Sequence, residues 1–172
     1  MTAEALCVGV HVGVLFLLAV AGALASGEEE QTPSGGPATV VFVCHHGNAK
    51  SLIASQWFNR LAVERGVSVR AVARGMEPEA PVPAAIAAKL SRDGFDVERY
   101  EPRGFSPADL DGASRVVLIG VERPAWIKTE RATVEKWDGI PPASEGYDAS
   151  RDAMRARIAA LLDALDKPRE RR

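Results

Sequence analysis

The stretch "VVFVCHHGNAKSLIASQWFNRL", residues 40–61, joins an apolar run to a cysteine, a short polar loop and an amphipathic segment. The run "TVVFV" at 39–43 is β-branched and aromatic, which is typical of a strand buried on both faces of a parallel sheet. Apolar residues then recur at helical spacing from Ile53 until Gly66, which predicts a helix with a glycine stop. The stretch therefore predicts a strand, loop and helix, with Cys44 where the strand ends.

The rest of the chain repeats this alternation. Apolar runs predict further strands at 67–73, at 115–120 and, shorter, at 133–137. A helix is predicted over 83–90, and a second, longer one near the C-terminus. The apolar stripe of that last helix consists of Met154, Ile158, Leu161, Leu162 and Leu165. The predicted fold class is α/β, a four-stranded parallel sheet with helices on both faces.

The N-terminal segment has the character of an export signal. No charged residue occurs from Ala5 to Gly27, and the stretch contains an Ala-x-Ala cleavage pattern at 23–25. Residues 1–25 are therefore predicted to be a signal peptide or, if uncleaved, an N-terminal membrane anchor, because the stretch is long enough to span a bilayer. We expect an exported protein, periplasmic or secreted, that contacts a membrane only through an uncleaved N-terminal segment.

Composition divides the remainder into three parts. Residues 26–38 are rich in Gly, Pro, Ser and Glu and predict a flexible linker. Residues 39–167 are enough for one domain, and 168–172 form a basic tail. The net charge of −2, with no basic run interleaved with aromatic residues, argues against a nucleic-acid partner.

The chain has two cysteines, Cys7 and Cys44, and cleavage of the signal would leave only Cys44. No intramolecular disulfide is then possible, although disulfides are ordinary in exported proteins. A solitary thiol directly after a buried strand indicates a chemical role. The alternative is a small buried hydrophobe at a strand end.

The loop after the first strand has the residues of an anion site that carries a nucleophile. Successive N–H groups ahead of a helix bind anions; Gly47 permits the left-handed backbone of such a turn, and Ala49 adds little bulk. A helix start and a nearby cation favour the thiolate form of Cys44, which can attack a bound phosphorus. Lys50 would hold the phosphoryl oxygens, and Ser51 would hydrogen-bond the sulfur.

The two histidines of the loop allow more than one interpretation. His45 and His46 could add positive charge to an anion site, or they could be polar surface. A metal site built from Cys44 and these histidines is disfavoured, because three consecutive residues rarely converge on one tetrahedral centre.

At "VFVCHHGNAKS" the chain resembles the active-site loop of the low-molecular-weight protein-tyrosine phosphatase and arsenate reductase superfamily, whose pattern is Cys, five residues, Arg, Ser. The resemblance extends through "ARGMEPEAPVPAAIAAKLSRDGFD", "ASRVVLIGVERP" and "KWDGIPPASEGYDASRDAMRARI", and so covers 39–165. It implies a four-stranded parallel sheet, a phosphocysteine intermediate, and an Asp from a late loop as general acid. It implies no metal or organic cofactor.

The chain departs from the family pattern within the loop. Lys50 stands in place of the Arg, and an ammonium cannot make the bidentate fork of a guanidinium. Gly47 and Asn48 fall one place later than in the commonest family loop.

The family's late Asp-Pro pair is replaced by Pro141 and Pro142, and the nearest acid is Asp138, which could be the general acid or a solvated turn residue. The predicted catalytic residues are Cys44, Lys50, Ser51 and Asp138. The predicted phosphate-binding residues are His45, His46, Gly47, Asn48, Ala49 and Lys50.

Three functions fit these residues. The first is hydrolysis of a phosphomonoester, either a phosphorylated protein such as a phosphotyrosine protein or a small molecule. The second is arsenate reduction, which would need an external thiol reductant because the mature chain has no second cysteine to resolve the adduct. The third is a non-catalytic phosphate-binding module that keeps anion affinity without turnover.

Overall fold

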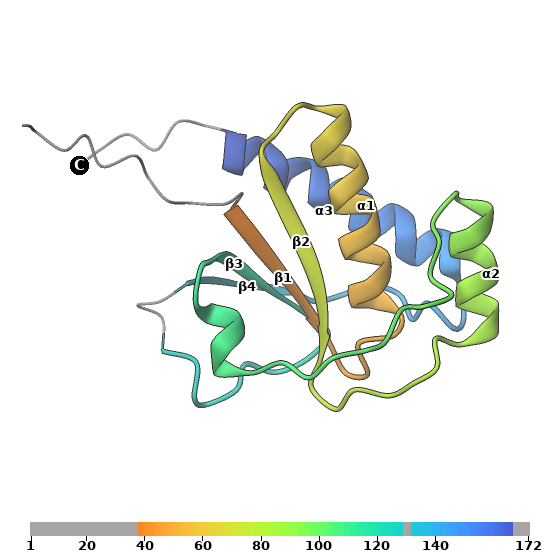
Figure 1. The fold of residues 1–172 in the computed structure, drawn as a ribbon, viewed down its shortest axis with the longest axis horizontal. Coiled ribbons are helices and arrows are strands. Elements are labelled where there is room, and N and C mark those ends of the chain that lie inside the picture. Colours follow the sequence, from red (N-terminus) through yellow and green to blue (C-terminus); the bar gives the residue numbers. More distant parts are fainter. Residues whose placement is uncertain (1–37, 129–131, 167–172) are drawn as a thin grey trace, which may run out of the picture. The chain divides into compact units, whose positions relative to one another are not determined.

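The computed structural model describes residues 38–128 and 132–166 (Figure 1). The predicted signal peptide or anchor, the predicted linker up to residue 37 and the predicted tail lie outside the described residues. The described elements follow one another in the order β1 (Ala38–Cys44), α1 (Lys50–Glu64), β2 (Val69–Gly75), α2 (Ala84–Arg92), η1 (Pro107–Leu110), β3 (Ala113–Ile119), β4 (Thr133–Trp137) and α3 (Tyr147–Asp166).

The strands form one parallel sheet in the order β2-β1-β3-β4. Cys44, the last residue of β1, pairs with Gly75 of β2, and Val43 pairs with Leu118 of β3. The carboxyl ends of the strands therefore meet at one edge, where ligands bind in open parallel sheets. The predicted α/β fold with a four-stranded parallel sheet is confirmed.

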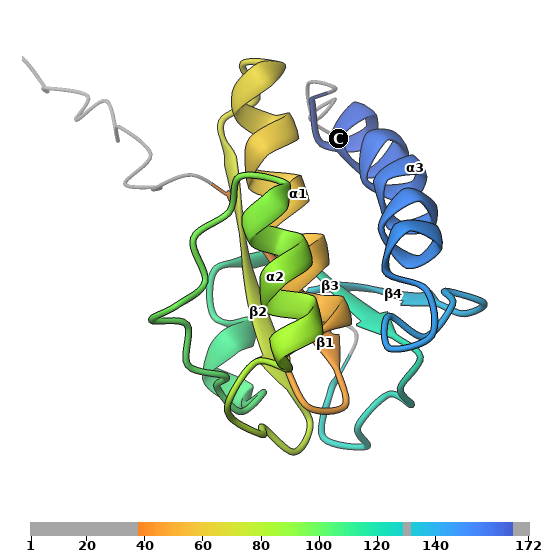
Figure 2. The same cartoon turned by 90° about the vertical axis from the view of Figure 1, so that its right-hand side faces the viewer.

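The three α-helices lie on one side of the sheet (Figures 1 and 2). Helices α1 and α3 pack against each other, and α2 lies outside α1. Phe42 of β1 anchors this layer, because its ring contacts Phe58 of α1 at 5.7 Å and Trp137 of β4 at 5.5 Å between centroids. The apolar stripe predicted for the C-terminal helix belongs to the same core, with Met154, Ile158 and Leu162 fully buried.

A second, smaller core covers the other side of the sheet. Val41 and Val43 point into it from β1, and Leu110 reaches it from η1. The α-helices all lie on the first face, so the cover here consists of the 3-10 helix η1 and loops. No helix was predicted at η1. Its start is held by Asp109, which accepts hydrogen bonds from both the backbone N–H and the hydroxyl of Ser106.

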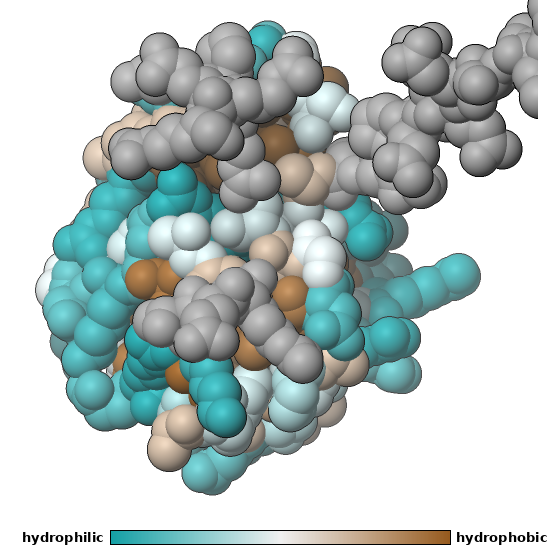
Figure 3. Space-filling view, turned by 90° about the vertical axis from the view of Figure 1, so that its left-hand side faces the viewer, coloured by the Kyte–Doolittle hydropathy of each residue, from teal (hydrophilic) through white to brown (hydrophobic). Residues whose placement is uncertain are grey.

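The surface on the η1 side is mostly hydrophilic, with small hydrophobic patches (Figure 3). Among the described residues, Trp126 is an exposed large apolar side chain, and its ring centroid lies 5.0 Å from that of Phe105. Among the described helices, none combines the length and apolar character needed to cross a bilayer.

Candidate active-site loop

The predicted nucleophile and its predicted partner meet beneath the loop. Cys44 ends β1 and Ser51 lies in the first turn of α1, and both side chains are buried. The Cys44 Sγ atom lies 3.1 Å from the Ser51 Oγ atom, within hydrogen-bonding distance for sulfur. The hydroxyl can therefore donate to a thiolate.

Two glycines let the loop close against the end of β2. Gly47 has φ +72°, the left-handed region predicted for it, and a Cβ there would come within 2.9 Å of the Gly75 backbone nitrogen. A Cβ on Gly75 would in turn lie 2.7 Å from the backbone carbon of His46. Side chains at either position would push the loop away from the sheet edge.

The carbonyl groups at the start of the loop are turned toward the rest of the protein. The carbonyls of Cys44, His45 and His46 accept hydrogen bonds from backbone N–H groups of residues 76–79, at 2.9 to 3.1 Å. The Gly47 carbonyl accepts a bond from the Tyr100 hydroxyl at 2.7 Å. Four consecutive carbonyls are thus occupied.

The N–H groups of the same loop are left available. None of the backbone N–H groups of residues 45–49 donates a hydrogen bond to any described residue. A curl of unpaired N–H donors ahead of the first turn of α1 concentrates positive potential, which is the requirement for an anion nest. The loop therefore presents the arrangement of donors that an oxyanion such as phosphate requires.

Asn48 holds the loop to the segment that follows β2. Its side-chain amide donates to the Glu79 carbonyl at 2.8 Å, and the Asn48 residue is buried. The predicted loop residue is therefore an anchor between the loop and the chain near the start of α2. The small Ala49 keeps the first turn of α1 accessible, and its carbonyl accepts the bond from Ile53 that begins the helix.

Lys50 is half-buried at the start of α1, and its ammonium lies beside Gly120, just after β3. A Cβ on Gly120 would stand 2.9 Å from the Lys50 Nζ atom. The Lys50 side chain makes no hydrogen bond or ion pair with a described residue. Since β3 lies next to β1, the ammonium is at the same sheet edge as Cys44.

The two histidine side chains turn to carboxylates at the surface. His46 Nδ1 lies 3.2 Å from a Glu79 oxygen, and His45 Nε2 lies 4.0 Å from a Glu77 oxygen. Their rings contact each other with centroids 4.4 Å apart and planes tilted by 47°. His45 and His46 therefore add backbone N–H donors to the loop, while their imidazoles pair with the segment after β2.

The predicted general acid, Asp138, comes directly after β4 and contacts Lys136 and Arg157. Its carboxylate is 3.6 Å from the Lys136 ammonium, its carbonyl accepts a bond from Arg157, and its side chain is 66% exposed. Asp138 does not line the cavity next to the loop, whereas Glu145 does. The Glu145 side chain has no hydrogen bond or ion pair to a described residue.

That cavity, of about 640 Å³, lies beside the loop of residues 44–49. It is lined from the loop side by His46, Asn48, Ala49 and Lys50 and from α2 by Ile86 and Lys89, and residues 142–149 form the opposite wall. Its size is typical of a small-molecule site. In the described part of the chain, no three His, Cys, Asp or Glu side chains form a cluster that could hold a metal ion.

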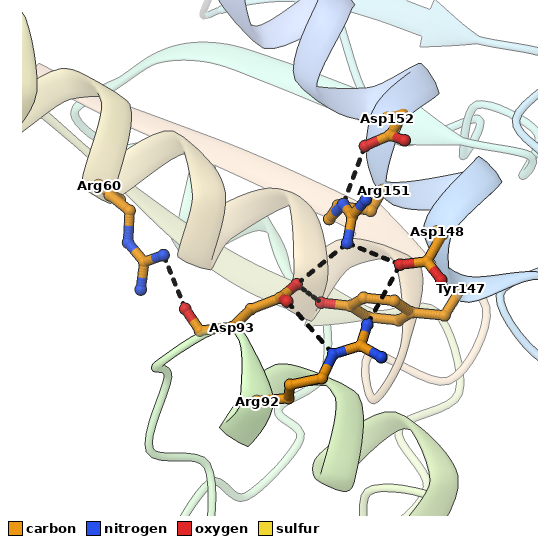
Figure 4. A network of polar contacts seen from close by, with 7 residues as sticks. All are labelled: Arg60, Arg92, Asp93, Tyr147, Asp148, Arg151 and Asp152. Atoms are coloured by element: carbon orange, nitrogen blue, oxygen red, sulfur yellow. Dashed lines mark hydrogen bonds and ion pairs between the residues drawn. The ribbon is translucent and has the colours of Figure 1, made fainter.

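A polar cluster holds the two walls of the cavity together (Figure 4). Asp93, just after α2, accepts a 2.7 Å hydrogen bond from the hydroxyl of Tyr147, the first residue of α3. Arg151 of α3 approaches the same carboxylate at 3.5 Å, and Arg92 at 3.8 Å. Burial, and secondly this hydrogen bond, raise the pKa of the Tyr147 hydroxyl, which therefore stays a donor at neutral pH.

Tyr100 supports the loop from outside it and was not among the site residues predicted from the sequence. Burial, and secondly the charge of Cys44, raise its pKa to about 12 against the opposing effect of Arg74, so the hydroxyl that bonds Gly47 is neutral. The sequence carried no periodic signal for this contact, because Tyr100 follows α2 in an irregular segment.

No protein-family model and no curated protein matches the sequence. Solved structures do resemble it. The thioredoxin-dependent arsenate reductase of Corynebacterium glutamicum has a TM-score of 0.63 and 21% identity to this chain. The match covers 77% of this chain and 63% of the reductase. The low-molecular-weight protein tyrosine phosphatase of T. tengcongensis has a TM-score of 0.58 and 20% identity, over 74% of this chain and 99% of that one.

A third similar structure is the YwlE arginine phosphatase of Geobacillus stearothermophilus, with a TM-score of 0.57 and 15% identity, over 75% of this chain and 93% of that one. The chain therefore has the fold of the low-molecular-weight protein-tyrosine phosphatase and arsenate reductase superfamily, as the resemblance of its loop predicted. At these identities the likeness establishes the fold.

Proposed function

We propose that the chain hydrolyses phosphomonoesters through a phosphocysteine on Cys44. The supporting observation is the loop itself, in which five consecutive N–H groups at 45–49 have no acceptor among the described residues while Cys44 Sγ lies 3.1 Å from Ser51 Oγ at the base. A phosphoryl group bound by these N–H groups would lie directly above the sulfur. Similar solved structures include a tyrosine phosphatase and an arginine phosphatase.

The reaction would run in two displacements. The Cys44 thiolate attacks phosphorus, the bond from phosphorus to the leaving oxygen breaks, and that oxygen takes up a proton. Water then attacks the phosphocysteine, which releases inorganic phosphate and restores the thiolate. The loop N–H groups and the Lys50 ammonium stabilise the charge on the phosphoryl oxygens in both steps.

The test is steady-state hydrolysis of an aryl phosphate under reducing conditions. The wild-type chain and a Cys7→Ser control should turn over, and Cys44→Ser should not. Because the nest is made of backbone, Cys44→Ser should still bind inorganic phosphate in calorimetry. A wild-type protein that binds phosphate without hydrolysing any aryl phosphate would instead be a non-catalytic binding module.

Arsenate reduction is a second candidate, favoured by the likeness to the Corynebacterium reductase. Arsenate has the charge and shape of phosphate and would use the same loop. Cys44 is the free cysteine of the described chain, so thiols outside it would have to supply the electrons and be oxidised to a disulfide. Arsenite formation that depends on added glutathione or thioredoxin would support this candidate.

A further inference from the structure

We propose that the cavity beside the loop holds the leaving group of the substrate, and that Lys89 binds a second anionic group on it, a carboxylate or a phosphate. This inference names the substrate class of the proposed hydrolysis and rests on it. The substrate would be a small phosphomonoester with an apolar body and a second negative charge.

The walls of the cavity suit an apolar body. Pro83 and Ile86 line it on the α2 side, and Pro142, Ala143 and Tyr147 line it on the α3 side. These rigid side chains lose little entropy when they contact a ring or a short aliphatic chain. Asn48, Ala49 and Lys50 of the loop line the cavity, so the leaving group of a phosphoryl bound by the loop would extend into it.

Two of the charged side chains that line the cavity already have partners. His46 pairs with Glu79, and the Asp148 carboxylate lies 3.2 Å from Arg92 and 2.7 Å from Arg151 (Figure 4). The charged side chains that line the cavity with no ion pair to a described residue are Lys50, Lys89 and Glu145.

Lys50 belongs to the phosphate-binding loop, so Lys89 is the cation left for another group. Lys89 is half-buried in the last turn of α2, and its side chain makes no hydrogen bond or ion pair with a described residue. A partly desolvated ammonium without a carboxylate partner has lost hydration that nothing replaces, and an anionic ligand would replace it. A cation here also suits the carboxyl end of a helix, which is a purely structural role.

The experiment compares ligands that cannot be hydrolysed. Binding of benzylphosphonate, 4-carboxybenzylphosphonate and 1,4-xylylene bisphosphonate to the full chain would be measured by calorimetry, for wild type, Lys89→Met and a Lys128→Met control. Lys128 carries the same charge and does not line the cavity. Thermal unfolding of each variant would accompany the titrations.

We expect the second anionic group to tighten binding about fivefold to tenfold in wild type and in Lys128→Met, as one partly buried ion pair would. Lys89→Met should lose this preference and bind benzylphosphonate as wild type does. The stronger of the two doubly charged ligands would indicate whether the second group is a carboxylate or a phosphate.

Three results would overturn the inference: no preference for a second charge in wild type, a preference that survives in Lys89→Met, or a Lys89→Met variant that changes only in melting temperature. A different result would overturn the proposed hydrolysis. A chain that shows the Lys89-dependent preference but hydrolyses no aryl phosphate would keep the ligand class and lose the phosphatase assignment.

Discussion

The ammonium of Lys50 occupies space that a side chain on Gly120 would take, since a Cβ there would lie 2.9 Å from Lys50 Nζ. Gly120 follows β3 with φ +63°, next to the strand that ends in Cys44. The glycine therefore leaves room for a lysine at the position where the resembling family has an arginine.

Gly120→Ala should displace the ammonium and lower kcat/KM for an aryl phosphate about tenfold, because the phosphoryl oxygens lose a positioned charge. Gly139→Ala is the matched control, with φ +71° and no atom within 4 Å of its added Cβ. Both variants should lose about 1 kcal/mol of unfolding free energy through backbone strain. Equal activity in the two variants would place Lys50 outside the anion site.

Ser51 should act on the sulfur, because its hydroxyl is 3.1 Å from Cys44 Sγ in a buried site. Ser51→Ala should lower kcat about 10- to 100-fold with little change in KM, since a hydrogen bond to a charged group is worth about 1.5–3 kcal/mol. Ser55→Ala, a buried serine of the same helix that bonds the Leu52 carbonyl, is the control. A similar loss in Ser55→Ala would mean that the effect comes from packing.

Tyr100 should hold the loop in its binding shape through the bond to Gly47. Tyr100→Phe removes that bond and should weaken phosphate binding about 3- to 10-fold, the worth of one neutral hydrogen bond. With the Tyr100 pKa at about 12, the hydroxyl stays protonated across neutral pH. The ratio of wild-type to variant affinity should therefore be constant from about pH 6 to 9.

The raised pKa of Tyr100 also makes the stability of the protein depend on pH above about 10. A raised pKa means that the native state favours the neutral phenol, so the stability that this gives is complete below the ordinary pKa of 10.0 and is lost as pH rises toward about 12. Between those values the unfolding free energy of wild type should fall more steeply than that of Tyr100→Phe. Parallel pH curves would contradict the assignment.

The proton for the leaving group should come from Glu145, the cavity carboxyl group that has no ion pair to a described residue. Glu145→Gln should slow alkyl phosphates at least tenfold more than activated aryl phosphates, because general acid catalysis matters most for poor leaving groups. Asp138→Asn should change both rates little, as Asp138 lies beside Lys136 and outside the cavity lining. The reverse pattern would restore Asp138, the acid predicted from the sequence.

The Asp93 carboxylate should stabilise the fold by joining the ends of α2 and α3. Its side chain is 12% exposed and accepts the Tyr147 hydroxyl, so Asp93→Asn should cost about 1–3 kcal/mol in urea unfolding. Asp152→Asn is the control, because Asp152 also contacts Arg151 but is 58% exposed, and should cost about 1 kcal/mol or less. Equal losses of unfolding free energy in the two variants would mean that the burial of the Asp93 carboxylate adds nothing to stability.

The four strands, the three α-helices and the positions of Cys44 and Ser51 follow from local patterns in the sequence. The run at 39–43 and the helical spacing after Ser51 are local periodicities, and they placed Cys44 and Ser51 on either side of one loop, as the structure has them. The left-handed turn at Gly47 was predictable for the same reason, since a loop this short between strand and helix needs it.

The distant residues that complete that loop come together only in the folded chain. Tyr100 bonds Gly47 from 53 positions away, and Gly75 receives the loop because β2 pairs with β1. Periodicity describes which face of an element is apolar, but it does not state which irregular segments the order of the strands brings to one edge. For that reason the sequence suggested Asp138 as the general acid from its position along the chain. Glu145 and Lys89 were identified only because they line the cavity in the folded chain.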